Sequence, residues 1–287
     1  MVIPIRDENP TRRKPVVTLV LIALNLAVYF GIQLPKESTP SNLIQGVSEA
    51  DEFTYRYAAI PCELAKGHPL DVDQFVSQQC SPAVRTNGAV GQQEVFPNKN
   101  VWLAVLFSMF MHGSILHVLG NMLFLWIFGN NVEDRLGPVV YVLFYLFAGV
   151  AAMAAHVAFN LDSTVPTLGA SGAIAGVMGA YIVWWPRARV TSIIPILFFF
   201  GFVELPAAVV LGIWFVLQFF TNPNEGVAWV AHVGGFATGA ALAYALHNVF
   251  PPTFPDATRT RPLWRRRTGP DDDDWDPGFG GGYRGRL

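Results

Sequence analysis

Long apolar runs alternate with shorter polar connections along most of this chain of 287 residues. A helix needs about 20 apolar residues to cross a hydrocarbon layer of roughly 30 Å, and most of the runs approach or exceed that length. The apolar windows lie at 16–34, 114–129, 139–161, 168–185, 193–220 and 227–250. The pattern therefore predicts an all-α membrane protein with six transmembrane helices.

A break at Gly113 and Ser114 separates the second window from an apolar run at 101–111. Serine is a favoured N-cap because its side-chain oxygen accepts a hydrogen bond from a backbone N–H of the first turn, so we expect Ser114 to cap the second helix. The first window, 16–34, follows basic residues but is longer than the roughly 7 to 15 apolar residues of a signal peptide. We therefore expect it to be a retained membrane anchor.

Composition and charge agree with this pattern. Apolar residues make up 52% of the chain and charged residues only 14%, which excludes an ordinary soluble domain. Most of the 19 Lys and Arg residues fall in the N-terminus, the even-numbered connections and the tail. The positive-inside rule then places both ends in the cytoplasm, and we expect a multi-pass protein of the plasma or inner membrane. We expect a lipid bilayer around the protein and no nucleic-acid partner.

These observations predict five successive parts. They are a cytoplasmic N-terminus (1–15), a first transmembrane helix (16–34), a long extracytoplasmic loop (35–112), the other five helices (113–250) and a disordered cytoplasmic tail (251–287). The tail is rich in Pro, Arg, Asp and Gly, a composition that cannot bury a core. The loop holds both cysteines, Cys62 and Cys80, and a disulfide between them would add about 3 kcal/mol on the chain-entropy estimate. Two unpaired thiols are the alternative.

Polar side chains in the predicted spans are candidates for function because such groups are costly in lipid. Ser171, His232, His117 and Asn121 all fall in the first turns of spans that run in the same direction, roughly 5 to 11 Å below their starts at 1.5 Å per residue. A serine hydroxyl becomes a nucleophile when a base lies about 3 Å away. Because no carboxylate is placed to orient His232, we predict a Ser–His dyad.

Small residues recur every fourth position on the fourth and sixth spans and let helix backbones approach closely. They are Gly172, Gly176 and Ala180 on one, and Ala231, Gly235, Gly239 and Ala243 on the other. The pattern predicts a tight contact that brings Ser171 and His232 together. Each feature also has a plainer interpretation: small residues often serve packing alone, and His232, His117 or Asn121 could simply link helices by hydrogen bonds.

Four motifs carry a family resemblance. They are HGSILHVLGN at 112–121, EDRLG at 133–137, GASG at 169–172, and AHVGG at 231–235 followed by Gly239. Over roughly 101–245 the chain resembles the rhomboid intramembrane serine proteases, a six-helix family whose members cleave transmembrane segments of membrane-protein substrates. The resemblance implies that Ser171 is the nucleophile and His232 the general base.

By the same resemblance, the side chains of His117 and Asn121 and the backbone N–H of Ser171 line the oxyanion hole, with Gly169 in the same substrate-binding group. His112 is a candidate for lining a water-filled cavity. Two departures are visible: the Trp-Arg pair of many members is missing at Leu103-Ala104, and Ala175 stands where some relatives place an aromatic ring against the catalytic histidine.

Span five is the predicted entry door for substrate, because Pro195, Gly201, Glu204 and Pro206 are unfavourable to a straight helix in lipid. A permanently kinked helix is the alternative. We expect no cofactor and no metal, since the six histidines form no HExxH or similar ligand set. Two other functions compete with proteolysis: a catalytically silent relative that binds or escorts membrane clients, and a small transporter, although no inverted repeat is evident.

Overall fold

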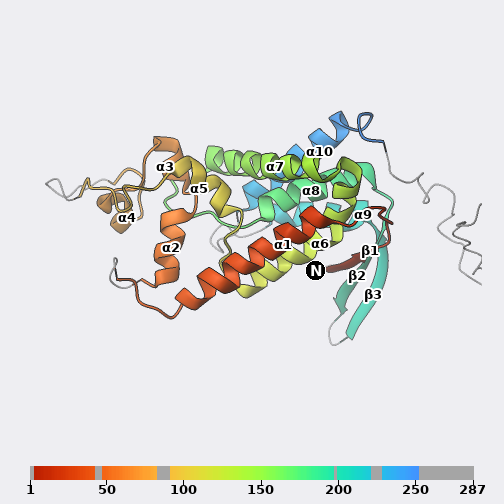
Figure 1. Ribbon diagram of the computed structural model, residues 1–287, viewed down its shortest axis with the longest axis horizontal. Helices are drawn as coiled ribbons and strands as arrows, with labels where there is room; N and C mark the ends of the chain where they lie inside the picture. The colour runs from red at the N-terminus through yellow and green to blue at the C-terminus, as the bar shows by residue number, and fades with distance from the viewer. Residues whose placement is uncertain (1–2, 43–46, 83–90, 197–198, 221–227, 252–287) are drawn as a thin grey trace, which may run out of the picture. The chain divides into compact units, whose positions relative to one another are not determined.

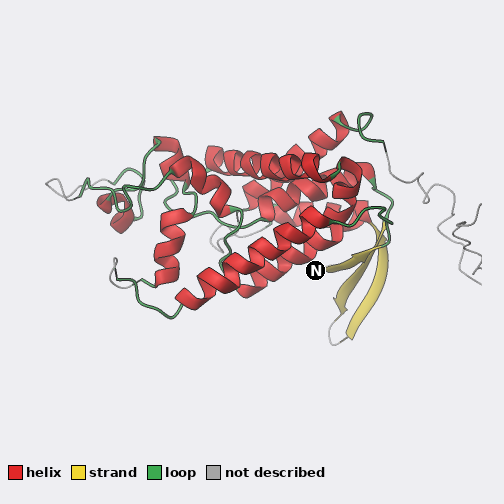
Figure 2. Ribbon diagram, viewed as in Figure 1, coloured by secondary structure: helices red, strands yellow, loops and turns green. Residues whose placement is uncertain are grey.

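A computed structural model describes residues 3–42, 47–82, 91–196, 199–220 and 228–251. The elements in chain order are β1 (Ile3–Asp7), α1 (Val16–Val28), η1 (Tyr29–Gln33), η2 (Leu34–Lys36), α2 (Glu49–Tyr57), α3 (Pro61–Lys66), α4 (Val72–Ser77), α5 (Val101–Ser108), α6 (Ile115–Leu136), α7 (Pro138–Phe159), α8 (Ser171–Trp184), β2 (Arg189–Ile196), β3 (Phe199–Pro206), α9 (Ala207–Gln218) and α10 (Trp229–Ala245). The fold is mostly helical (Figure 2). The tail predicted to be disordered lies outside the described residues except for Pro251.

Three helical segments of the described residues are long and apolar enough to cross a membrane: Val16–Lys36, Ile115–Leu136 and Pro138–Phe159. The first of them consists of α1, the π-helix η1 and the 3-10 helix η2 in an unbroken run. Helix α1 contacts α6 (Figure 1). Two shorter apolar helices, α8 and α9, do not reach that length. The predicted count of six spans is therefore not confirmed.

The second predicted helix begins as expected but ends later. Ser114 is its N-cap, and the Ser114 hydroxyl accepts a hydrogen bond from the backbone N–H of His117. The helix continues to Leu136 instead of ending near 129, because the polar residues of its last turns are buried with partners. The Glu133 carboxylate accepts hydrogen bonds from the backbone N–H groups of Val17 and Thr18, satisfying free donors at the start of α1.

Arg135, two residues after Glu133, makes a second set of contacts at the end of α6. Its guanidinium donates hydrogen bonds to the backbone carbonyls of His247 and Phe250, just beyond α10. It also lies over the ring of Trp184, 4.3 Å from its centroid. The motif at 133–137 therefore joins the start of α1 to the end of α10.

The predicted fifth span, 193–220, is wrong in its first half. Residues 189–196 and 199–206 form the antiparallel pair β2–β3, and β1 pairs with β2 to complete a three-stranded sheet in the order β1-β2-β3 (Figure 2). Only α9 remains helical. The whole window is apolar but too long for one crossing, and its Val, Ile and Phe residues favour strands. Glu204 lies on this sheet and forms an exposed ion pair with Arg189 at 3.1 Å.

This sheet removes the argument for a kinked fifth helix. Pro195, Gly201 and Glu204 belong to β2 and β3, where they cannot loosen a membrane helix. Pro206 ends β3 and is the N-cap of α9. The structure therefore does not support the substrate entry site that was predicted from these residues.

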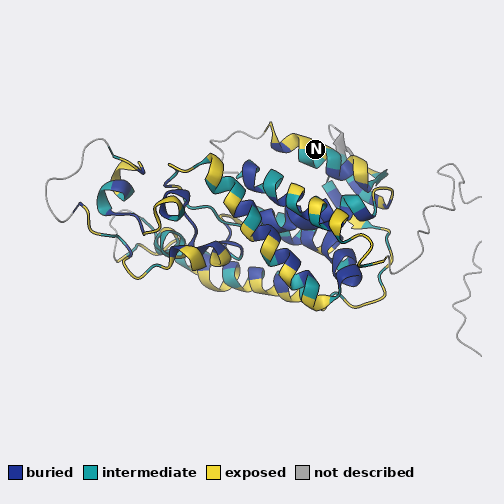
Figure 3. Ribbon diagram, turned by 90° about the horizontal axis from the view of Figure 1, so that it is seen from above, coloured by how far each residue is buried: buried dark blue, intermediate teal, exposed yellow. Residues whose placement is uncertain are grey.

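The centre of the fold is the contact between α8 and α10, with α7 packed on both. The predicted ridges of small residues meet here. A Cβ added at Gly235 would collide with the backbone carbonyl of Gly172, and one added at Gly239 would collide with that of Gly176. Figure 3 shows the buried residues gathered between the helices and exposed ones along the outer faces. The predicted close approach of these two helices is confirmed.

The described residues between η2 and α5 form α2, α3 and α4 and are cross-linked. Cys62 and Cys80 form a disulfide. Beside it, the Lys99 ammonium and the Glu63 carboxylate form a buried ion pair at 2.6 Å. Burial raises the pKa of Glu63 and lowers that of Lys99, and their mutual attraction opposes both shifts.

Candidate active site

Ser171 is the first residue of α8, whose predicted start at 168 is three residues too early. The first intrahelical hydrogen bond runs from the N–H of Ile174 to the carbonyl of Ala170. The backbone N–H groups of Ser171, Gly172 and Ala173 therefore precede the hydrogen-bonded part of the helix. Free N–H groups at a helix N-terminus, together with the helix dipole, favour negative charge.

His232 lies in the first turn of α10, directly against the serine. Its Nε2 is 2.8 Å from the Oγ of Ser171, which is hydrogen-bonding distance. Both residues are partly buried. Because α8 and α10 pack with their glycine backbones in contact, two short side chains can bridge the helices. The structure thus brings together the two residues that sequence analysis had paired.

His232 has a second partner, which was not predicted from the sequence. Gln218, the last residue of α9, places its Oε1 2.7 Å from His232 Nδ1. The side chain of Gln218 is itself buried, and its Nε2 donates to the carbonyl of Trp214 at 2.9 Å. A single glutamine in an apolar window was the available signal, since polar side chains in such runs need a partner.

An aromatic ring also lies beside His232, supplied by α9. The ring of Trp214 has its centroid 5.8 Å from that of His232 at an interplanar angle of 39°, and it stacks on Phe236. The buried Ala175 on α8 offers no ring. In this chain the aromatic contact to the imidazole therefore comes from Trp214 on α9 and not from Ala175 on α8.

Gly169 brings His117 close to the serine. Its φ of +122° is a conformation that side chains rarely adopt. A Cβ added there would lie 2.9 Å from His117 Nε2 and 3.5 Å from Ser171 Oγ, so both groups border the same small space. The N–H of Gly169 donates to the carbonyl of Ser108, which holds the turn before α8 in place. His117 and Gly169 therefore lie where the sequence placed them, next to Ser171.

Asn121 is near this group but already has a partner. Its Nδ2 lies 2.9 Å from Nε2 of His112, and the ring of His112 packs edge-on against that of His117. His112 is only 1% exposed, so it is a buried hydrogen-bonding residue at the edge of the site. A second glutamine, Gln33, exchanges two hydrogen bonds with the backbone of His112. Gln33 was not singled out from the sequence.

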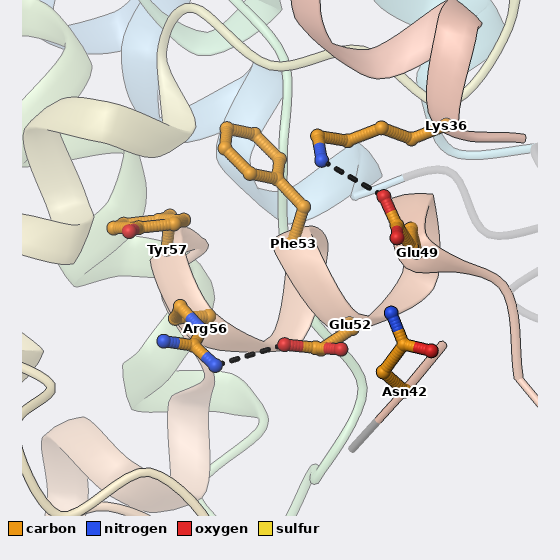
Figure 4. A pocket seen from close by; sticks show the side chains of 7 residues that line it. All are labelled: Lys36, Asn42, Glu49, Glu52, Phe53, Arg56 and Tyr57. Carbon is orange, nitrogen blue, oxygen red and sulfur yellow. Dashed lines mark hydrogen bonds and ion pairs between the residues drawn. The ribbon is translucent and has the colours of Figure 1, made fainter. Parts of the chain in front are cut away.

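A separate cavity of about 460 Å³ lies beside α2 (Figure 4). Its lining residues are Lys36, Asn42, Glu49, Glu52, Phe53, Arg56 and Tyr57. Four of its charged groups pair with one another, Lys36 with Glu49 and Arg56 with Glu52. None of the residues around Ser171 lines it. Among the described residues, no group of three or more His, Cys, Asp or Glu could hold a metal ion.

Comparison with known proteins decides the family. Residues 99–249 match the profile of a protein family described as the Rhomboid domain, which covers more than half of the chain. The chain belongs to the rhomboid family. The matched region includes Ser171, His232, His117 and Asn121, and as a family member this rhomboid is a multi-pass membrane protein.

Three relatives illustrate the range of similar rhomboids. RHOMBOID-like protein 4 of Arabidopsis thaliana is 30% identical over 172 residues, 58% of this chain and 39% of the relative. RHOMBOID-like protein 6, mitochondrial, of the same plant is 24% identical over 236 residues, 81% of this chain and 67% of the relative. Rhomboid protease GluP of Bacillus subtilis is 38% identical over 81 residues, 28% of this chain and 15% of the relative.

The similar rhomboids differ from this chain in length, and several carry a location in their names. The chain spans about two fifths of the length of the first of them, 39%. Several similar proteins are named as mitochondrial, including a rhomboid of Saccharomyces cerevisiae. The predicted plasma-membrane location is therefore not supported.

Proposed function

We propose that this rhomboid is a serine endopeptidase that cleaves transmembrane segments of other membrane proteins. The observation that carries the proposal is the 2.8 Å contact between Ser171 Oγ and His232 Nε2. A serine needs a base at this distance to lose its proton during attack. A catalytically silent relative would need neither the contact nor the open N–H groups beside it.

The proposed reaction proceeds in two stages. Ser171 Oγ attacks the scissile carbonyl carbon while its proton passes to His232 Nε2, and the C–O bond that forms gives a tetrahedral oxyanion. His232 then gives the proton to the leaving amine as the C–N bond breaks, leaving an acyl-enzyme. Water hydrolyses this ester by the same route, with His232 again as base, and releases Ser171.

The oxyanion needs preorganised donors, each worth about 3 to 4 kcal/mol in comparable sites. Two groups border the space beside Ser171 Oγ: the N–H groups that begin α8, and His117 Nε2, which lies against Gly169. We assign the oxyanion to these groups. Asn121 joins them only if its amide leaves His112, with which it is paired at 2.9 Å.

The arrangement in the membrane is part of the same proposal. We assign α8, α9 and α10 to the bilayer together with the three longer segments, giving six spans with both ends in the cytoplasm and the site near the outer face. The helix α8 has 14 residues, about 21 Å at 1.5 Å per residue, and is buried along most of its length. A helix enclosed by its neighbours need not reach both surfaces of the bilayer by itself.

A cleavage assay tests the proposal. The purified protein, reconstituted in liposomes, is incubated with a fluorogenic transmembrane peptide, and Ser171→Ala and His232→Ala are measured beside it. We expect cleavage by the wild type and a loss of at least about 10³-fold in each variant, as for removal of a member of other serine catalytic units. Equal cleavage by wild type and Ser171→Ala would exclude Ser171 as the nucleophile. Specific binding of the peptide without cleavage would instead favour a silent, client-binding protein.

A further inference from the structure

The amide of Gln218 has only one orientation that fits its surroundings. One end lies 2.9 Å from the carbonyl oxygen of Trp214, which accepts hydrogen bonds and cannot donate. The NH₂ group must therefore face Trp214, because the opposite orientation would place two acceptors against each other. The carbonyl oxygen Oε1 is then the atom that faces His232.

This orientation fixes the proton on the imidazole ring. Oε1 of Gln218 accepts hydrogen bonds and has no proton to give, so Nδ1 of His232, 2.7 Å away, must be the donor. A neutral imidazole carries one N–H, and its other nitrogen is an acceptor. Nε2 is therefore the acceptor, and it is the atom that faces the hydroxyl of Ser171 at 2.8 Å.

The same contact joins two helices. Gln218 ends α9 and His232 lies in the first turn of α10, while the ring of Trp214 lies beside the imidazole one turn earlier on α9. Gln218 is only 8% exposed, so its side chain is not solvated as a polar side chain at the end of a helix commonly is. A hydrogen bond on one edge of the ring and an aromatic surface near its face limit rotation of the imidazole.

We propose that Gln218 is a positioning residue that holds His232 in the Nδ1–H tautomer, so that Nε2 is free to take the proton of Ser171. The site is then a Ser–His–Gln triad, in which a neutral amide has the orienting role that a carboxylate has in other serine proteases. The proposal rests on the proteolytic function proposed above. The amide also stabilises the imidazolium that forms during attack, since its carbonyl accepts from Nδ1–H in both protonation states.

Two substitutions of Gln218 separate orientation from packing. Gln218→Met keeps the length of the side chain and removes the acceptor. Gln218→Glu, when protonated, keeps both hydrogen bonds, because its hydroxyl can donate to Trp214 and its carbonyl can accept from His232. Ile213→Met, at a residue of α9 that is 40% exposed, is the matched control for a methionine on this helix.

The kinetic test measures cleavage of the fluorogenic transmembrane peptide by all three variants and the wild type in liposomes. We expect Gln218→Met to lower kcat by about 10- to 100-fold with KM within about twofold, because the lost interaction belongs to the proton transfer and not to substrate binding. We expect Gln218→Glu to recover most of kcat at mildly acidic pH, and Ile213→Met to match the wild type. Equal kcat for Gln218→Met and wild type would overturn the proposal.

A spectroscopic test reports the tautomer without any reaction. In protein labelled with ¹⁵N-histidine, His232→Gln identifies the His232 signals by their loss. We expect Nδ1 protonated and Nε2 unprotonated in the wild type, and a growing Nε2–H population in Gln218→Met. A wild-type protein with the proton on Nε2 would contradict the proposal, whether or not Gln218→Met folds. If no cleavage depends on Ser171, the proteolytic function fails while this measurement still decides the tautomer.

Discussion

Gln33 and His112 exchange two hydrogen bonds: Gln33 Nε2 donates to the backbone carbonyl of His112 at 3.0 Å, and the N–H of His112 donates to Gln33 Oε1 at 2.9 Å. Gln33 is the last residue of the π-helix η1 that follows α1, so this pair joins the first helical segment to the edge of the candidate active site. It fixes the backbone of a histidine whose ring is paired with Asn121.

Replacing Gln33 tests this connection. Gln33→Leu leaves a buried N–H and a buried carbonyl of His112 without partners, and each such group costs about 1 to 3 kcal/mol. We expect a lower free energy of unfolding and reduced peptide cleavage. Thermal unfolding in detergent, measured beside Ile32→Ala at a neighbouring residue that is 40% exposed, checks it. A Gln33→Leu protein as stable as the control would show that these groups are satisfied in another way.

Glycine contacts between α8 and α10 predict a second stability effect. Gly239→Ala places a methyl group against the backbone carbonyl of Gly176, so the two helices must move apart. We expect a loss of about 1 to 3 kcal/mol in stability, as for other overpacked sites. We also expect lower kcat, because the same two helices carry Ser171 and His232.

The matched control for this substitution is Gly212→Ala on α9. A Cβ at Gly212 meets no atom within 4 Å, so alanine should leave stability unchanged or raise it by about 0.5 to 1 kcal/mol. Both proteins are compared by unfolding and by peptide cleavage. If the two substitutions have the same effect, the backbone contact at Gly239 does not limit the approach of the helices.

Asp7 predicts a dependence of stability on pH. Burial raises its pKa from 3.8 to about 6, although its carboxylate accepts hydrogen bonds from Asn131 and Tyr181. Since the folded pKa lies above the unfolded one, the protonated form is favoured by folding. The contribution of the protonated Asp7 carboxyl to the free energy of unfolding is complete below about pH 4 and is lost as the pH rises through about 6.

Asp7→Asn separates this effect from other titrations. Asparagine is neutral at every pH, so we expect the variant to lose the part of the pH dependence between about 4 and 6 and to be more stable than wild type above pH 6. Unfolding is measured at a series of pH values for both proteins. Identical pH profiles would mean that Asp7 is not protonated on folding.

Removal of the disulfide is expected to lower stability locally. Cys62 and Cys80 are 18 residues apart, and opening a loop of this size costs about 3 kcal/mol on the chain-entropy estimate. Replacing both by Ala should make the segment around α3 and α4 more sensitive to protease, as read by limited proteolysis. We expect peptide cleavage to remain, because neither cysteine contacts Ser171 or His232. Loss of cleavage at full stability would give this segment a part in the reaction.

Much of the candidate active site could be predicted from the sequence, because helix periodicity and residue chemistry are local properties. The N-cap Ser114, the small residues of α8 and α10, and the pairing of Ser171 with His232 all follow from spacing along single helices and from the cost of polar groups in lipid. Hydropathy averaged over a window is a weaker guide. Averaged hydropathy predicted a helix through 193–206, a range that contains β3 and part of β2. Strand β2 pairs with β1, and no local sequence pattern indicates that partner.

The residues that carry the candidate chemistry and the helices that could approach closely were predictable, because both depend on the identity of residues a few positions apart. The groups that each polar side chain faces became known from the packing of the helices. That packing paired Asn121 with His112, Glu133 with the start of α1, and Gln218 with His232. Those partners lie on different elements, and a hydrogen bond depends on the distance and direction between two atoms, which packing sets and sequence separation does not.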